Sequence, residues 1–131
     1  MPYIVAYQKH IDHRTIALTL PNDSGETELC TIGGTTYVSV PDAVTLPPQP
    51  TEIADSVSVV TDDVTLDTIR QCSSHIQLIN NRVVQRIRER YSVDDELKML
   101  RIAPSDESAA YGEYVEECRQ WGREQKAVLG L

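Results

Sequence analysis

Residues 28–40 read ELCTIGGTTYVSV, and this stretch decides the fold of the N-terminal half of the chain. Gly33 and Gly34 separate two runs that are rich in β-branched and aromatic residues. A tight turn between antiparallel strands requires positive φ angles, which glycine adopts without steric cost. The stretch therefore predicts a β-hairpin.

Two further β-rich runs precede this hairpin. Tyr3–Tyr7 is a short apolar run, and in Arg14–Leu20 isoleucine and leucine alternate with alanine and threonine, as in a strand with one buried face. Pro21 and the turn-forming residues 22–25 end the second run. We therefore expect residues 1–40 to form a β-rich unit, either a four-stranded antiparallel sheet or a small open barrel.

Prolines are concentrated after this unit. Four of the seven prolines lie between residues 41 and 64, and residues 47–50 read PPQP. Such a composition favours extended, stiff backbone. We expect residues 41–64 to be a Pro-rich extended spacer that holds two units apart, with Glu52–Val60 able to add one edge strand.

The spacing of apolar residues takes a helical period from Thr65 onward, and residues 65–131 are the third predicted segment. Between Thr65 and Tyr91 the spacing begins as a 3–4 repeat, which predicts the seam of a coiled coil, and later becomes 4–4. The predicted oligomer interface is Ile69, Cys72, Ile76, Ile79, Val83 and Ile87. Because most of these residues are β-branched, we expect a homo-oligomer in which a trimer is favoured over a dimer.

Two more helices are expected after this one. Ser92 and Asp95 have the spacing of a capping box, which starts a short helix, and Pro104 ends it. Ser105 is expected to cap the last helix. The apolar and aromatic residues of these two helices form a predicted docking face: Val93, Leu97, Leu100, Tyr111, Tyr114 and Trp121. The predicted fold class is α+β, with an N-terminal antiparallel β unit, an extended spacer, and a C-terminal oligomerising helix and helical hairpin.

The chain is acidic, with 12 Lys and Arg against 20 Asp and Glu and a net charge of −8. Free binding to nucleic acid or to an anionic membrane surface is disfavoured, since both need a cationic surface. Residues 82–90 nevertheless hold four arginines, and the last helix is rich in acids. We expect charge pairing, within the hairpin or between subunits, among Arg82, Arg86, Arg90, Glu113 and Glu117. The alternative, phosphate contact by a nucleic-acid regulator, predicts steeply salt-dependent binding.

Large aromatic side chains are scarce, because the chain has no Phe and one Trp. Aromatic side chains usually dominate burial, so the missing burial is expected to come from contacts with other subunits. No apolar run approaches the roughly 20 residues of a membrane span. The N-terminus also lacks the pattern of a signal peptide. We therefore expect neither secretion nor membrane insertion.

No stretch of the sequence matches a catalytic motif. The nearest group to a ligand cluster is His10, Asp12 and His13, but a zinc site needs a further ligand and only the remote Cys30 is a candidate. We expect a polar connection between strands there, and reduced packing residues at the three widely spaced cysteines. The chain is therefore expected to be no enzyme, with no metal and no cofactor. The alternative is a small hydrolase or metal enzyme that uses His10, Asp12 and His13 and holds stoichiometric zinc.

Four segments carry a resemblance to a known class of protein. They are Thr31–Pro41 (TIGGTTYVSVP), Leu46–Pro50 (LPPQP), Arg86–Lys98 (RIRERYSVDDELK) and Tyr114–Trp121 (YVEECRQW). In this order they resemble small proteins encoded in the tail modules of tailed bacteriophages, near the tail-fibre and baseplate genes.

The resemblance implies a structural virion protein, either a short tail fibre or a connector between fibre and baseplate. Such a protein is synthesised and assembled in the host cytoplasm and ends in the virion tail. Its expected partners are copies of itself and other tail or baseplate proteins. The alternative is a tail or tail-fibre assembly chaperone that is absent from the mature particle. The resemblance implies no catalytic residue.

Overall fold

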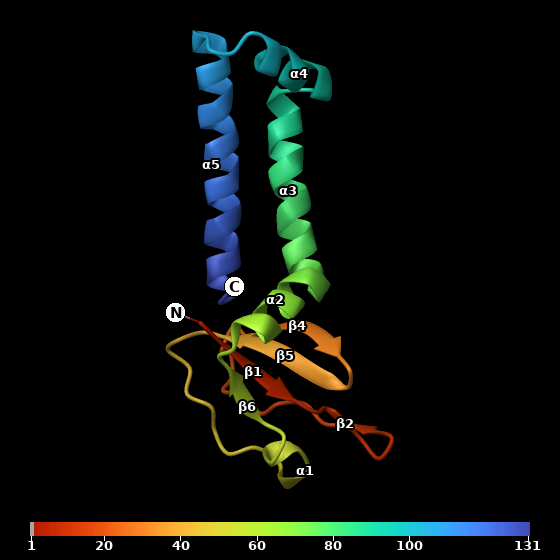
Figure 1. Ribbon diagram of the computed structural model, residues 1–131. Helices are drawn as coiled ribbons and strands as arrows, with labels where there is room; N and C mark the ends of the chain where they lie inside the picture. The colour runs from red at the N-terminus through yellow and green to blue at the C-terminus, as the bar shows by residue number, and fades with distance from the viewer. Residues whose placement is uncertain (1) are drawn as a thin grey trace. The chain divides into compact units, whose positions relative to one another are not determined.

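The computed structural model describes residues 2–131 and confirms the α+β class, with strands in the N-terminal half and helices in the C-terminal half (Figure 1). The chain divides into two compact units. The first, here called the β unit, comprises the residues up to Ile76 together with Ala127–Leu131. The second, here called the hairpin unit, comprises Gln77–Lys126. This division differs from the expected boundaries at residues 40 and 64.

The β unit is built on a four-stranded antiparallel sheet with the strand order β4-β5-β1-β6. Its strands are β1 (Tyr3–Tyr7), β4 (Thr27–Ile32), β5 (Thr35–Val40) and β6 (Ser58–Val60). The turn between β4 and β5 consists of Gly33 and Gly34 with φ angles of 56° and 83°, which confirms the predicted hairpin. Its positive φ angles explain why two glycines stand at this turn.

The expected strand Arg14–Leu20 is mostly irregular. Only β3 (Arg14–Thr15) pairs, with β2 (His10–Ile11), in a separate two-stranded hairpin. Ile16, Leu18 and Leu20 still pack against the core, but the backbone around them bonds elsewhere; Thr19, for example, exchanges hydrogen bonds with the Gln49 side chain. The alternating pattern therefore marks a buried side of the segment without marking a strand.

Residues 41–64 also differ from the expected spacer. Helix α1 (Thr51–Ala54) places Ile53 at 0% exposure in the core, and Val44 and Leu46 pack against the same cluster. Strand β6 pairs with β1 and supplies the edge strand expected from Glu52–Val60. The segment is thus part of the β unit, because its apolar side chains cover the sheet.

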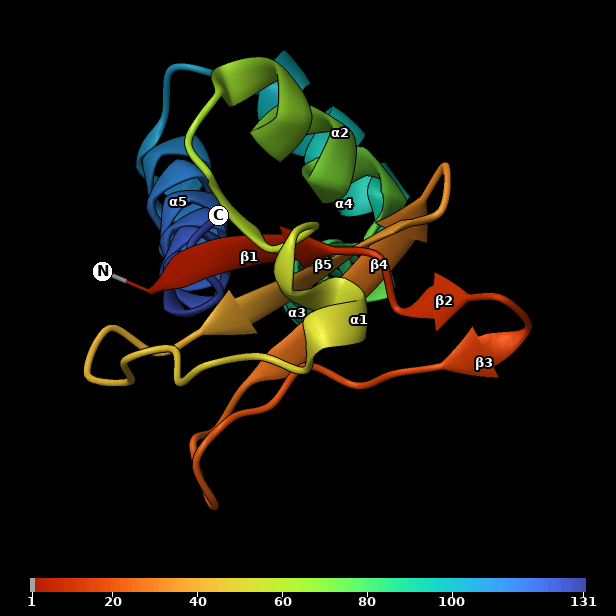
Figure 2. The same ribbon diagram turned by 90° about the horizontal axis from the view of Figure 1, so that it is seen from below.

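The central strand β1 has apolar side chains on both faces of the sheet. Val5 and Tyr7 join one core cluster with Val38, Val40 and Ile53. Ile4 joins the other, which is completed by Leu29, Ile69 and the C-terminal Leu129 and Leu131. Figures 1 and 2 show α1 and α2 (Asp63–Cys72) on opposite faces of this sheet. Burial on both faces explains the continuous apolar run of β1.

The helix expected from Thr65 to Tyr91 is two helices, α2 and α3 (Ser74–Arg90). Asp62 is the N-cap of α2, and its carboxylate accepts a hydrogen bond of 2.9 Å from the Thr65 N–H. The break falls at Ser73, whose ψ angle of 125° is extended. Ser73 is fully buried and its hydroxyl has no hydrogen-bond partner among the described residues. The apolar stripe expected from Thr65 to Tyr91 is therefore interrupted by one extended residue between α2 and α3.

The last two helices are confirmed. Helix α4 (Val93–Arg101) begins with the expected capping box, in which Ser92 and Asp95 bond each other's backbone N–H. Helix α5 (Asp106–Val128) follows, and Ser105 accepts a hydrogen bond of 3.1 Å from the Ser108 N–H, as expected of an N-cap. In the hairpin unit, α4 therefore lies at the closed end, where the chain passes from α3 to α5 (Figure 1).

Candidate functional site

Two residues of the predicted oligomer interface, Ile79 and Val83, pack against the chain's own last helix. A Cβ atom built on Gly122 of α5 would lie 2.7 Å from Val83 Cγ2 and 3.9 Å from Ile79 Cγ2 of α3. The two helices therefore pack closely at a residue without a side chain. Val83 and Ile79 are covered by the chain's own last helix.

The remaining residues of the predicted oligomer interface have different surroundings. Ile69 is fully buried in the core of the β unit, so it is not open to a second copy. Ile76 is 2% exposed, Cys72 is exposed and Ile87 is half-buried. The six residues thus do not form one exposed edge, because the break at Ser73 divides them and α5 covers part of them.

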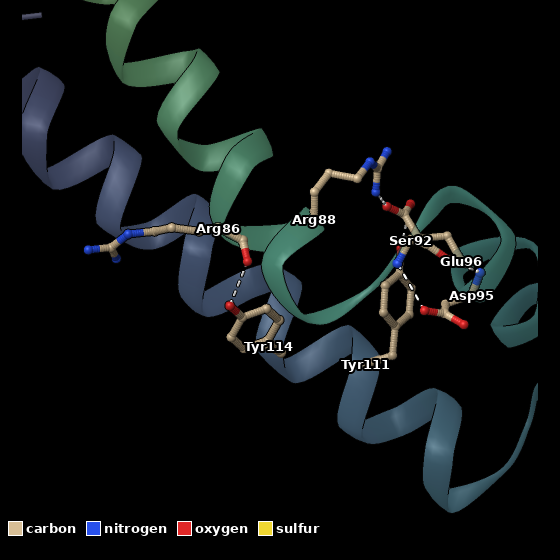
Figure 3. Close-up of polar contacts among 7 residues, drawn as sticks. All are labelled: Arg86, Arg88, Ser92, Asp95, Glu96, Tyr111 and Tyr114. Carbon is tan, nitrogen blue, oxygen red and sulfur yellow. Dashed lines mark hydrogen bonds and ion pairs between the residues drawn. The ribbon is translucent and has the colours of Figure 1, made fainter.

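Three tyrosines join α3 to α5 near the closed end. The rings of Tyr91 and Tyr111 meet edge to face with centroids 4.9 Å apart, and Tyr114 lies 5.8 Å from Tyr91. The Tyr114 hydroxyl donates a hydrogen bond of 2.7 Å to the Arg86 carbonyl, and the Tyr111 hydroxyl donates one of 2.8 Å to Glu96 (Figure 3). The rings of Tyr111 and Tyr114, which were expected on a docking face, pack within the hairpin unit.

Two of the arginines of α3, Arg86 and Arg90, contact aromatic rings rather than Glu113 or Glu117. The Arg86 guanidinium lies 4.1 Å from the centre of the Trp121 ring, and that of Arg90 lies 4.7 Å from the centre of the Tyr114 ring. Arg88, which was not among the expected residues, forms an ion pair with Glu96 (Figure 3). Among the described residues, no ion pair joins Arg82, Arg86 or Arg90 to Glu113 or Glu117.

The aliphatic part of the predicted docking face remains exposed. Val93, Leu97 and Leu100 of α4 are 55%, 54% and 73% exposed. Their spacing of four and three residues puts them on one side of the helix, here called the α4 ridge. Asp94 and Arg101 flank it along a shallow hollow. Exposed apolar side chains that gather on one helix face are typical of a protein-binding surface.

One face of α5 is acidic. Glu113, Glu117 and Glu124 lie with Trp121 along one shallow surface. Their spacing of four, four and three residues places these four side chains on one helix face. Glu113 and Glu117 are therefore free to meet a basic partner, whereas Trp121 is partly covered by Arg86.

The histidines and Asp12 of the candidate ligand cluster lie on an exposed hairpin, and the described residues offer no group of metal ligands. His10, Asp12 and His13 lie on the exposed β2–β3 hairpin, where the His10 ring bonds the Thr15 hydroxyl at 3.1 Å. Within residues 2–131 no group of three or more His, Cys, Asp or Glu side chains is arranged to hold a metal ion. Burial raises the pKa of the Cys30 thiol, which lowers the share of reactive thiolate at neutral pH.

A polar hollow of the β unit has no histidine among its lining residues. It lies beside β1 and β6 and is lined by Gln8, Tyr37, Ser56, Ser58 and Asp62, among others. Ser56 donates to the Ile53 carbonyl and Asp62 caps α2, and neither has a histidine beside it in the lining. These groups are used in holding the backbone.

Two features of the hairpin unit are not among the sequence predictions. The first is Gly122, whose place opposite Val83 is a long-range contact without a local signal. The second is a row of cations on α5, Arg119, Arg123 and Lys126, whose spacing of four and three residues places them on one face. That spacing is visible in the sequence and indicated a basic stripe beside the acidic face.

No protein-family model, no curated protein and no solved structure matches this chain. Among the described residues, no helix has the length and apolar character that crossing a membrane requires.

Proposed function

We propose that this chain is a non-enzymatic, protein-binding component of a bacteriophage tail module, and that the α4 ridge is its main contact surface. The observation that carries the proposal is the exposure of Val93, Leu97 and Leu100 on a helix whose position is fixed on both sides. The capping box fixes the start of α4, and the Arg88–Glu96 and Tyr111–Glu96 contacts tie it to the neighbouring helices. A rigid apolar ridge binds a partner with little loss of conformational entropy.

The assignment to a phage tail rests on the sequence resemblance. The segment Arg86–Lys98, which carries much of that resemblance, is also the segment that forms the end of α3, the capping box and the first half of the α4 ridge. The part of the chain that resembles tail-module proteins is therefore the part that presents the contact surface. The virion tail, or its assembly in the host cytoplasm, is the corresponding location.

Of the two roles that the resemblance implies, the closed hairpin favours the assembly chaperone. A trimeric fibre was expected because the seam needed partners to bury it. Since α5 of the same chain covers Ile79 and Val83, a three-stranded coiled coil is no longer required to bury these residues. The role as a fibre or connector remains the second candidate, because the exposed ridge also suits a permanent contact.

Co-expression with the other proteins of the same tail module tests this proposal. The wild-type chain is expected to retain a tail or tail-fibre protein through purification, and Leu97→Glu with Leu100→Glu is expected to lose it. Val64→Glu is the matched control, because Val64 is a 78% exposed valine of α2 and is not part of the ridge. If the wild-type chain retains no tail protein, the proposal fails. Mass spectrometry of purified virions separates the two roles, since a chaperone is absent from them and a connector is present.

A further inference from the structure

A groove with a basic rim runs along the hairpin unit between α3 and α5. It encloses about 310 Å³, and Val83, Val84 and Gly122 form its apolar floor. Arg119, Arg123 and Lys126 lie along its α5 side. Val84 is 53% exposed, so the floor is open to a partner. A groove of this kind fits a helix that carries apolar and acidic side chains together.

Two of the three rim cations are unpaired. Arg123 forms an ion pair with Glu116 and hydrogen bonds with Gln120. Arg119 and Lys126 form no ion pair within the described part of the chain. A positive rim around an apolar floor attracts a negatively charged partner and orients its approach.

The same chain offers a helix with these properties. The α4 ridge of Val93, Leu97 and Leu100 is exposed, and Asp94 beside it forms no ion pair among residues 2–131. The first turn of α4 is acidic, and its last turn is basic because it holds Lys98 and Arg101. The ridge is therefore complementary to the groove in apolar character along its length, and in charge at its first turn, where Asp94 lies.

The two surfaces lie at different places along the hairpin unit. The ridge is on α4, at the closed end, whereas Val83 and Val84 precede the last two turns of α3 and Lys126 is near the end of α5. A single chain cannot place its own ridge in its own groove. Two copies related by a two-fold axis, with their hairpins antiparallel, place each ridge at the groove of the other.

We infer that the chain forms a reciprocal dimer in which the α4 ridge of each copy occupies the basic groove of the other. This inference rests on the proposed function, because the same α4 ridge is the proposed contact surface for the tail protein. The tail protein and the second copy therefore compete for the ridge. The dimer covers the apolar ridge while no tail partner is bound. It also replaces the expected trimer by an interface that needs no continuous coiled coil.

Sedimentation equilibrium of the purified protein tests the inference with two variants. The ridge variant is Leu97→Glu with Leu100→Glu, and the groove variant is Val84→Lys. Wild type is expected to be a dimer, and each variant is expected to raise the dimer dissociation constant by at least about tenfold. Val64→Glu and Val64→Lys are the matched controls and are expected to remain dimers. Circular dichroism checks that all variants are folded, which their exposed positions favour.

Mixing the two variants gives the sharper test. In a dimer of ridge variants, or of groove variants, both contacts contain a changed residue. In the mixed dimer one contact has the wild-type ridge and the wild-type groove, so a 1:1 mixture is expected to regain dimer. A monomeric wild type, or dimers unaffected by both variants, would overturn the inference.

The two proposals fail in distinguishable ways. A monomeric wild type whose tail partner is retained by the wild-type chain and lost by the ridge variant overturns the dimer and leaves the proposed function. A dimer that dissociates in both variants, in a protein that retains no tail protein, supports the dimer and overturns the proposed function.

Discussion

Gly122 of α5 faces Val83 of α3 so closely that a Cβ atom on residue 122 would lie 2.7 Å from Val83 Cγ2. Real Cβ atoms do not approach another carbon so closely, so the absence of a side chain at this position permits the contact. Gly112, in the same helix, has no atom within 4 Å of its built Cβ. The two glycines of α5 therefore differ in their surroundings while sharing one backbone conformation.

Alanine at these two glycines is expected to have effects of opposite sign. Gly112→Ala should stabilise the protein by about 0.5–1 kcal/mol, because alanine favours a helix interior over glycine. Gly122→Ala gains the same preference but forces Val83 to move, and overpacking costs about 1–3 kcal/mol. We expect net destabilisation by about 1 kcal/mol, measured by urea unfolding. Val83→Ala in the Gly122→Ala background should remove the overpacking cost. Equal stabilisation by both alanines would show that α3 and α5 do not pack there.

Arg86 is expected to stabilise the hairpin through the Trp121 ring, 4.1 Å from its guanidinium. Arg86→Met keeps an apolar stem but removes the charge, and the loss of a cation–π contact at such a site costs about 0.5–1 kcal/mol. Trp121 is the only tryptophan, so its fluorescence reports this contact directly. Arg82→Met is the matched control on the same helix, because no ring contact or ion pair involves Arg82 in the described chain. A Trp121 emission spectrum that responds equally to both changes would contradict the stacking.

Features set by neighbouring residues were predictable from the sequence. The Gly33–Gly34 hairpin and the Ser92–Asp95 capping box each depend on a few adjacent residues, and both are present. The apolar stripe of α3 was also visible, but a 3–4 spacing is the same whether a second copy or the chain's own α5 covers it. Its partner could therefore not be read from the spacing.

Features set by distant contacts were not predictable in the same way. The burial of Ile53 depends on β1 and β5, and the exposure of Leu97 and Leu100 depends on what α3 and α5 leave uncovered. The prolines of residues 41–50 predict extended backbone, but they do not indicate which surface of the protein that backbone packs against. For the candidate site, the sequence identified Val93, Leu97 and Leu100 as surface residues. It did not show that Tyr111 and Tyr114 belong to a different, packed cluster, because that depends on how α3 and α5 pack.

The two aspartates at helix starts are expected to make stability depend on pH. Hydrogen bonds from the Thr65 hydroxyl and N–H lower the pKa of Asp62 below its ordinary value of 3.8, and those from Ser92 lower the pKa of Asp95 in the same way. A lowered pKa in the folded state gives stabilisation that is complete above the unfolded value and is lost as the pH falls through the folded value. The midpoint of thermal unfolding should therefore fall as the pH is lowered below 3.8.

Asp62→Asn and Asp95→Asn test the origin of this dependence. Asparagine also caps helices well but does not titrate in this range. The double variant is expected to lose less of its thermal stability between pH 5 and pH 3, roughly the range that contains the ordinary aspartate pKa. An unchanged pH profile would assign the acid sensitivity to other carboxylates.

Ile53 is expected to be essential to the β unit although it lies in the Pro-rich segment that resembles a spacer. Its side chain is fully buried against Val5 and Val40. Ile53→Ala removes this packing and leaves a cavity, which costs about 2–5 kcal/mol for a buried isoleucine. Val64→Ala, at a side chain that is 78% exposed, is the matched control and should change the free energy of unfolding by less than about 0.5 kcal/mol. Hydrogen exchange of the β1 and β5 amides is the direct measurement, because Ile53 packs on these strands and its loss should speed their exchange. If Ile53→Ala left those amides as well protected as Val64→Ala does, residues 41–64 would be a spacer as their prolines first indicated, and the boundary of the β unit would return to residue 40.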